Sequence, residues 1–359
     1  MENKWITRAY RDGDEEGILE LWKTVYPEKE LDGKRWIRWW RWMYKENPAG
    51  KAWIWLADDG NKIVGQAAFV PVLMKIGTEL VVGFQTIDAM THPDYRHQGI
   101  FFSLSHKAYE ATAQDNVHIG YGFSNDNSYP IAIKKLNCLE MPKMKVMVKV
   151  FNWKNVIKLK TKSKFSQIVL AIGADLIFNK ALFMIQRGPA ETDLTINQVT
   201  HFDERFDELW NNICGQAQIM TVRKKEYLNW RYHAPDTNYI ILAAEKNRKI
   251  YGYLVMQNTI KPFIKESIIF DIIAQSEEIM HCLVSRALEE CRQNNTDMIF
   301  YSSITNRTYH KILKKNGFIS PPFIKGGYFS VYSSSSSISK DFLSDSQNWL
   351  INTGDSDTI

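Results

Sequence analysis

The residues best suited to chemistry lie in one short stretch, Thr91–Phe101, with the sequence THPDYRHQGIF. The stretch follows an alternating apolar run at 84–90, which predicts a strand, and precedes the amphipathic pattern of a helix at 100–112. A chain that leaves a strand, turns at Pro93 and then opens a helix has several backbone N–H groups without partners. Because these groups point the same way and lie at the positive end of the helix dipole, they favour an anion such as a pyrophosphate.

Two side chains strengthen this interpretation. Gly99 lets the backbone approach a phosphate with no side chain in between, and Arg96 adds a fixed positive charge. We therefore expect an anion site whose residues are Arg96, His97, Gln98, Gly99, Ile100 and Phe101.

The sequence offers no clear nucleophile or metal site. A Gly-x-Ser-x-Gly turn is absent, and the four cysteines (Cys138, Cys214, Cys282 and Cys291) show no Cys-x-x-Cys or Cys/His metal spacing. Their irregular placement is typical of reduced thiols, so we expect no disulfide framework and no metal.

The elements that position this loop occur twice, because the chain resembles itself once. Four pairs of landmarks recur in the same order, with a separation that drifts only from 188 to 180 residues (209 minus 21; 308 minus 128). They are Leu21-Trp22 with Leu209-Trp210, Trp40–Tyr44 with Trp230–Tyr232, Lys62–Gly65 with Lys249–Gly252, and Ser128-Tyr129 with Thr308-Tyr309.

Each repeat is predicted to fold as helix, helix, hairpin, long strand, helix, strand, helix and strand. This order predicts an α/β chain of the α+β type with mixed sheets, in two tandem domains. We place an N-terminal domain at 1–152, a helical linker at 153–194, a C-terminal domain at 195–332, and a serine-rich joint with a C-terminal segment at 333–359.

Here the sequence resembles the GNAT superfamily of N-acetyltransferases, whose signature is [Arg/Gln]-x-x-Gly-x-[Gly/Ala]. Arg96, Gly99 and Phe101 occupy the three positions, and Phe101 departs from the pattern. The resemblance covers roughly 5–150 and 195–332, and it implies that acyl-CoA binds in a gap where the strand before the loop separates from the next strand. In the second repeat Ser276, Glu277 and Glu278 open the helix where the loop would lie, so their carboxylates would repel a pyrophosphate.

The resemblance also assigns residues around that gap. It implies that the main chain of Met90 and Thr91 holds the pantetheine arm, and that Asn125 and Ser128 belong to the second motif of the family. The tyrosine that usually protonates the leaving thiolate is replaced by Ile133. Tyr129 on the same helix is therefore the candidate substitute acid, with an ordinary packed tyrosine as the alternative. Asp88, on the strand that leads to the loop, is the candidate general base, with a strand-end carboxylate satisfied by hydrogen bonds as the alternative.

The expected function is the transfer of acetyl from acetyl-CoA to a primary amine, such as an amino sugar or amino acid, by direct attack. The acceptor would be a small molecule, and tandem GNAT proteins of this general appearance suggest a cell-surface glycan precursor. One alternative is a Fem-type aminoacyl transferase, against which the Arg96–Gly99 loop argues. A second alternative is a non-catalytic acyl-CoA-binding or scaffold protein.

Composition limits the partners and the location. The net charge of +5 is too small for a dedicated nucleic-acid binder. The N-terminus lacks a signal-peptide core, and the apolar run at 165–186 contains Asp175 and Lys180, so we expect a cytoplasmic protein without a transmembrane span. The spacing of Trp36, Trp39 and Trp40 indicates a buried helix stripe rather than a membrane or nucleic-acid surface.

The last twelve residues, 348–359, carry Trp349, Leu350 and Ile351 and end in an acidic turn. A segment this apolar can contribute enough burial to dock. We therefore expect it to fold back, with Asp355, Asp357 or the terminal carboxylate at the acceptor cleft, although a merely structural tail is the alternative.

Overall fold

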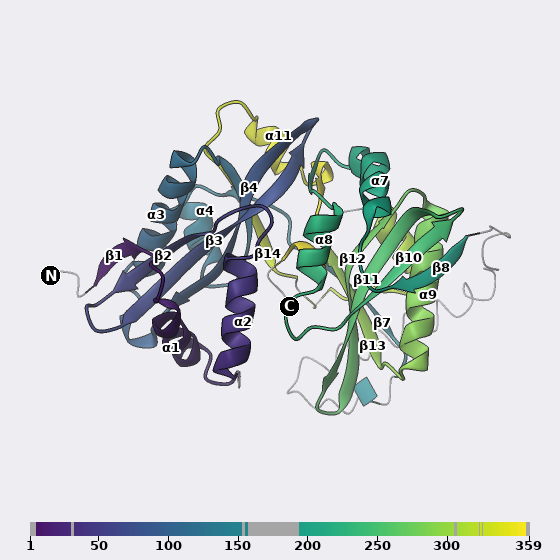
Figure 1. Ribbon diagram of the computed structural model, residues 1–359, viewed down its shortest axis with the longest axis horizontal. Helices are drawn as coiled ribbons and strands as arrows, with labels where there is room; N and C mark the ends of the chain where they lie inside the picture. The colour runs from purple at the N-terminus through teal and green to yellow at the C-terminus, as the bar shows by residue number, and fades with distance from the viewer. Residues whose placement is uncertain are drawn as a thin grey trace.

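The computed structural model describes residues 5–29, 32–152, 155–156, 194–304, 307–322, 324 and 326–356. These residues form two mixed β-sheets with helices packed on them (Figure 1). In the described residues, the first sheet has the strand order β1-β2-β3-β4-β5-β14-β6, with β9 added to β3 and β15 added to β9. The second sheet has the order β7-β13-β12-β11-β10-β8.

The first repeat supplies most of the first sheet. Its elements are β1 (Ile6–Ala9), α1 (Glu15–Val25), α2 (Gly33–Tyr44), β2 (Trp53–Asp58), β3 (Ile63–Ile76), β4 (Glu79–Thr91), the 3₁₀ turn η1 (Pro93–Tyr95), α3 (Ile100–Gln114), β5 (Ile119–Ser124), α4 (Tyr129–Lys134), β6 (Leu139–Glu140) and β7 (Lys145–Val150).

Helices cover both faces of this sheet because side chains alternate along its strands. On one face, Ile100 and Leu104 of α3 pack with Val64 and Ala67 of β3. On the opposite face, the tryptophan stripe of α2 packs with Val70 and with other strand residues whose side chains point to that face. Within that stripe Trp36 and Trp40 are buried, as expected, and Trp39 is half-buried.

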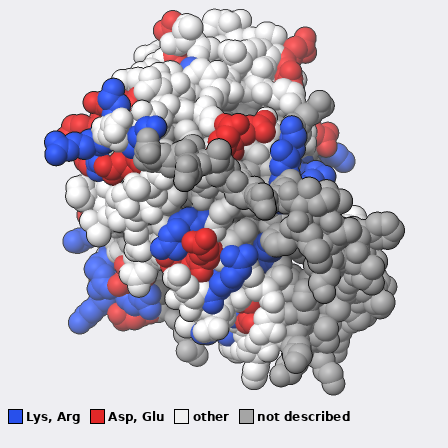
Figure 2. All heavy atoms as spheres, turned by 90° about the vertical axis from the view of Figure 1, so that its right-hand side faces the viewer, with Lys and Arg blue, Asp and Glu red and all other residues white. Residues whose placement is uncertain are grey.

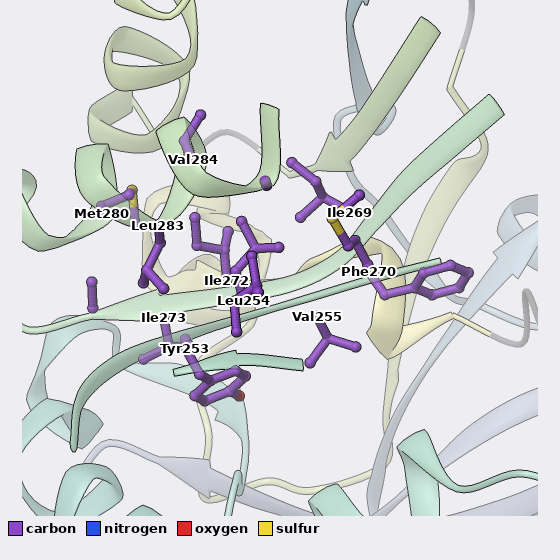
Figure 3. Close-up of a cluster of buried hydrophobic side chains, with 14 of the residues drawn as sticks. Tyr253, Leu254, Val255, Ile269, Phe270, Ile272, Ile273, Met280, Leu283 and Val284 are labelled. Atoms are coloured by element: carbon purple, nitrogen blue, oxygen red, sulfur yellow. The ribbon is translucent and has the colours of Figure 1, made fainter. Parts of the chain in front are cut away.

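The second repeat follows the same order. Its elements are β8 (Thr195–Val199), α7 (Glu204–Ile213), η2 (Cys214–Gln216), β9 (Ile219–Thr221), α8 (Lys225–Tyr232), β10 (Tyr239–Lys246), β11 (Lys249–Lys261), β12 (Ile264–Ala274), α9 (Glu277–Gln293), β13 (Met298–Ser303), α10 (Arg307–Lys315) and β14 (Tyr328–Ser333). Figure 3 shows α9 over β11 and β12, with Leu283 between the helix and the strand residues Leu254 and Ile272.

Each repeat gives its last strand to the sheet of the other. Strand β7 pairs with β13, from Met298↔Val150 to Ser303↔Lys145. Strand β14 pairs with β5, from Tyr328↔Ser124 to Ser333↔Ile119. The sheets are therefore interlocked, and residues of the second repeat become part of the wall of the first sheet.

The expected α/β fold with mixed sheets is confirmed, and its elements occur twice in the same order. The expected linker at 153–194 lies almost entirely outside the described residues, and so does the apolar run at 165–186. The domain boundaries therefore stay a prediction.

None of the helices in the described part of the chain is both long and apolar enough to cross a bilayer. On the face seen in Figure 2, basic and acidic side chains lie close together.

The C-terminal segment, defined here as residues 345–356, folds back onto the body as expected. It follows α11 (Lys340–Ser344) and contains η3 (Ser346–Asn348), β15 (Trp349–Leu350) and η4 (Thr353–Asp355). Strand β15 pairs in parallel with β9, and Trp349, Leu350 and Ile351 are all buried. The serine-rich stretch before it is partly built into the fold, because Ser333 ends β14 and the Ser334 N–H donates to the His118 carbonyl.

Candidate functional site

Strand β4 separates from β5 where the sequence predicted a gap. The two strands pair in parallel only from Phe84↔Gly120 to Thr86↔Gly122, although both continue beyond that point. On its other side β4 remains paired with β3 as far as Thr91, with a bulge near Asp88. The edge of Met90 and Thr91 that faces away from β3 therefore borders the gap, as the resemblance implied.

The bulge places Asp88 in an unusual backbone conformation, with φ of 47°. A residue other than glycine rarely adopts positive φ, and it does so where the surrounding structure holds it there. The Tyr44 hydroxyl lies 2.5 Å from Asp88 Oδ2, and the Gln66 side chain donates to the Asp88 carbonyl at 3.2 Å. These contacts fix a carboxylate at the edge of the gap.

The loop after β4 presents the free backbone N–H groups that the sequence predicted. The N–H groups of residues 97–102 are called the donor cluster below. The chain turns through η1, passes Gly99 at φ of 80°, and enters α3 at Ile100. Among the described residues, no backbone N–H from His97 to Phe102 has a hydrogen-bond acceptor within the protein. A Cβ built on Gly99 would meet nothing within 4 Å, so the space beside this glycine is open. Six neighbouring donors at a helix N-terminus are well suited to a diphosphate.

A cavity of about 1110 Å³ joins the gap to the loop. The expected residues that line it are Asp88, Met90, Thr91, Arg96, His97, Gly99, Ile100, Phe101, Asn125 and Ser128. The Gln98 side chain lies outside the wall, and its amide group donates to the Asp94 carbonyl at 3.4 Å. Its backbone N–H nevertheless belongs to the donor cluster.

Asn125 and Ser128 shape the turn that leads into α4. The Asn125 side-chain oxygen accepts hydrogen bonds from the Asn127 and Ser128 N–H groups, at 2.9 and 3.0 Å, and from the Ser128 hydroxyl. Both residues therefore have a structural role at the rim of the cavity as well as a place in its wall.

Tyr129 does not line the cavity. Its hydroxyl donates to Glu140 Oε1 at 3.0 Å, and its ring stacks on Tyr328 with 4.1 Å between centroids. Burial and the hydrogen bond with Glu140 raise the pKa of Tyr129 to about 12. The geometry thus favours the alternative of a packed tyrosine over a proton donor at the gap.

The sequence missed several wall residues that come from distant segments. Ser330 and Tyr332 of β14 line the cavity, and the Tyr332 ring stacks on Tyr109 at 3.8 Å. Tyr44 is not a wall residue itself, but from the end of α2 its hydroxyl contacts Asp88 in the wall, and the sequence did not indicate this contact. Cys138 also lines the cavity, but burial raises the pKa of its thiol, which favours the unreactive protonated form.

The second repeat differs at the corresponding loop. Ser276 caps α9 by accepting the Ile279 N–H at 3.3 Å, and Glu277 and Glu278 occupy the first turn. The hydrogen bond to Ser276 lowers the pKa of Glu278, so this helix start carries negative charge. No group of His, Cys, Asp and Glu in the described residues is arranged to hold a metal ion.

Comparison with known proteins agrees with this geometry. Residues 7–134 match the family described as an acetyltransferase (GNAT) domain. No curated protein matches the sequence. Residues 7–134 are therefore a GNAT acetyltransferase domain.

Three solved structures share the fold across nearly the whole chain. A GCN5-related N-acetyltransferase from Anabaena variabilis ATCC 29413 is 11% identical, with a TM-score of 0.60, over 91% of this chain and 72% of its own. A conserved protein of unknown function from Enterococcus faecalis V583, described as a probable N-acyltransferase, is 8% identical, with a TM-score of 0.61, over 91% and 71%. The N-myristoyltransferase of Saccharomyces cerevisiae with bound myristoyl-CoA is 10% identical, with a TM-score of 0.60, over 92% and 83%. At these identities the likeness concerns the fold alone.

Proposed function

We propose that the protein is an acyl-CoA-dependent N-acyltransferase that moves an acetyl group from acetyl-CoA to a primary amine of an amino sugar or amino acid. The observation that carries the proposal is the combination of six backbone donors at α3, an open gap between β4 and β5, and a carboxylate at the edge of that gap. Free N–H groups alone occur at every helix start, so the proposal depends on the gap and the carboxylate that lie beside them.

The described residues fit an acyl-CoA. The N–H groups from His97 to Phe102 and the Arg96 guanidinium would hold the pyrophosphate, because they supply directed donors and positive charge. The free edge of Met90 and Thr91 would hold the amides of the pantetheine arm. The bound coenzyme would supply an activated acyl thioester.

The chain's own residues would then manage the amine. An ammonium group cannot attack a carbonyl, so a base must first take its proton. Asp88 is the carboxylate in the cavity wall, and the Tyr44 hydroxyl orients it through the 2.5 Å contact to Oδ2. We assign Asp88 the role of general base and Tyr44 the role of positioning residue. Tyr129 receives no role, since it lies outside the wall.

The second repeat would help to form the acceptor side rather than bind a second coenzyme. Its strand β14 brings Ser330 and Tyr332 into the wall, and the acidic start of α9 disfavours a pyrophosphate. We further propose that the acceptor is a small cytoplasmic amine, such as a precursor of a cell-surface glycan.

Calorimetric titration with acetyl-CoA, followed by an amine screen for release of free CoA thiol, tests the proposal. We expect binding, and thiol release that depends on one class of amine. Absence of acetyl-CoA binding would overturn the proposal. Binding without release for any amine would favour a non-catalytic acyl-CoA-binding protein, and acyl transfer from aminoacyl-tRNA alone would favour a Fem-type enzyme. Parallel titrations with octanoyl- and myristoyl-CoA would define the acyl length.

A further inference from the structure

The second repeat contains a gap equivalent to the one that forms the cavity. Strands β12 and β13 pair in parallel only from Glu266↔Met298 to Ile269↔Tyr301 and then separate, as β4 and β5 do after Thr86↔Gly122. A bulge in β12 follows the separation and places Asp271 near the gap, much as the β4 bulge places Asp88. The two gaps are therefore built alike.

The C-terminal segment fills this second gap. Asn352 forms an antiparallel bridge with Ser303 at the end of β13, and the Ile304 N–H donates to the Ile351 carbonyl at 3.2 Å. The Thr353 hydroxyl accepts from the Ser302 N–H at 3.2 Å and donates to the Ser302 carbonyl at 3.1 Å. The segment thus satisfies the strand edge that the separation leaves unpaired.

Buried charges hold the segment in the gap. The Arg223 guanidinium donates to Asp271 Oδ2 at 3.0 Å and to Asp355 Oδ2 at 2.6 Å, and all three side chains are only about 1% exposed. Arg231 donates to the carbonyls of Gly354 and Ser356, at 2.9 and 3.1 Å. Loss of one partner would leave an uncompensated buried charge, so these contacts resist displacement of the segment. Asp355 is consequently a structural anchor, and it does not line the cavity where the sequence suggested a base.

The same segment touches the wall of the coenzyme cavity. The Tyr121 hydroxyl donates to the Asp355 carbonyl at 3.2 Å, while Tyr121 also lines the cavity. Tyr121 is paired with Gln85, one position before β4 and β5 separate. Trp349 packs edge-on against the Tyr121 ring, with 6.5 Å between centroids. One buried tyrosine therefore links the filled gap of the second repeat to the gap of the first.

We propose that residues 349–356 are a built-in ligand of the second repeat, and that they position the Tyr121 wall of the cavity, so that the C-terminal segment and coenzyme binding are coupled. The coenzyme part of this inference rests on the proposed function. The inference that the segment positions Tyr121 in the cavity wall rests only on the contacts described above.

Hydrogen–deuterium exchange on the full-length chain tests the wall without any ligand. Thr353→Val removes the anchor to Ser302, and we expect at least threefold faster exchange both in 349–356 and in β5 at 119–124. A segment that is only structural would loosen β12 and β13 and leave β5 unchanged, which would overturn the inference. Tyr332→Phe is the matched control, because Tyr332 lines the same cavity and its ring stacks on Tyr109. This control should leave exchange in 349–356 as in the wild type.

Addition of acetyl-CoA tests the coupling. We expect saturating acetyl-CoA to slow exchange in 349–356 at least twofold in the wild type and in Tyr332→Phe, but not in Tyr121→Phe. An unchanged segment in the wild type with bound acetyl-CoA would overturn the coupling, and so would a response retained in Tyr121→Phe. If acetyl-CoA does not bind at all, the proposed function fails, and the measurement without ligand still decides whether the segment positions the wall.

Discussion

Trp42 and Trp230, which lie 188 residues apart in the sequence, hold each other in a reciprocal contact. The indole N–H of each donates to the backbone carbonyl of the other, at 2.8 and 3.0 Å, and the rings stack with 4.8 Å between centroids. The two tryptophans lie in the last turns of helices α2 and α8, and these helices occupy corresponding places in the two repeats. The contact therefore joins equivalent positions of the two repeats by a local pseudo-twofold relation.

This reciprocity predicts energetic coupling across the contact. Trp42→Phe and Trp230→Phe each remove one hydrogen bond and reduce the stacked area, so each should lower the free energy of unfolding by about 1–3 kcal/mol. Because either change also weakens the geometry of the other bond, the double variant should differ from the sum by about 0.5–2 kcal/mol. Chemical denaturation of the four proteins measures this difference. As a control, Trp36→Phe changes a buried indole for which the described residues offer no hydrogen-bond partner, and it should be additive with Trp230→Phe. Additivity of the Trp42 and Trp230 changes would contradict the coupling.

The loop predicts a sharp effect of charge at one position. Gly99→Glu places bulk and negative charge in front of the donor cluster, and we expect it to weaken acetyl-CoA binding at least 100-fold, which is about 2.7 kcal/mol. Gly77→Glu is the matched control, since Gly77 also has positive φ (60° against 80°) and open space around its Cβ position. Both variants should lose similar stability from backbone strain, but only Gly99→Glu should lose binding. Calorimetry measures the affinity and thermal melts measure the stability. Equal affinities of Gly99→Glu and Gly77→Glu for acetyl-CoA would contradict the assignment of the coenzyme site.

The two repeats should differ in coenzyme binding. The filled gap of the second repeat and the acidic start of α9 predict one acetyl-CoA per chain. Glu277→Ala/Glu278→Ala removes the repulsive charges but leaves the gap filled, so the stoichiometry should remain one and the affinity should change less than twofold. Titration calorimetry gives both values. A stoichiometry of two in the wild type would contradict the asymmetry.

The sequence predicted the loop well because its structure is set locally. A proline that turns the chain and a glycine at positive φ before a helix act within a few residues, so Pro93 and Gly99 can be interpreted without knowing the fold. The buried stripe of α2 was predictable for the same reason, since its spacing lies within one helix. The match of residues 7–134 to a GNAT domain confirms the recognition based on this motif.

The other wall residues depend on pairing between distant segments. The alternation in β14 is the same whichever sheet it joins, so nothing local indicates that Tyr332 meets Tyr109 in the first repeat. Tyr44 and Asp88 meet because a bulge in β4 turns the carboxylate towards α2, and the bulge is a property of the β3–β4 register. The sequence placed Tyr129 on the correct helix, but the stacking of its ring on Tyr328 determines where its side chain points.

His310 predicts a specific loss of stability in mild acid. Its ring lies 2.9 Å from the Ser303 hydroxyl, and burial lowers its pKa from 6.5 to about 4. Because the unfolded chain binds this proton more readily, stability is fully present above pH 6.5 and is lost as the pH falls from 6.5 towards 4. Between pH 7.5 and pH 5 this group should account for about 2 kcal/mol of the decrease. His310→Gln should lower stability at pH 7.5 but show a decrease with pH that is smaller by that amount, as measured by denaturation at both pH values. Parallel pH profiles for the two proteins would show that His310 is not the group responsible.

Asp88 and Tyr44 make the last prediction, because they separate chemistry from coenzyme binding. Asp88→Asn keeps the shape of the side chain but removes the proton acceptor, so turnover should fall about 100- to 10,000-fold. Acetyl-CoA affinity should stay within about threefold, since the donor cluster at α3 is untouched. Tyr44→Phe keeps the ring and removes the hydroxyl that contacts Asp88 Oδ2, so turnover should fall by a smaller factor, about 10-fold. If Tyr44 acts only by positioning Asp88, Tyr44→Phe should have little further effect in the Asp88→Asn background. Steady-state assays of thiol release with the identified amine measure turnover in the wild type, the two single variants and the double variant, and calorimetry measures their acetyl-CoA affinities. Equal turnover in Asp88→Asn and the wild type would assign the base to another residue, and a loss of acetyl-CoA binding in either variant would place the pair in the coenzyme site instead.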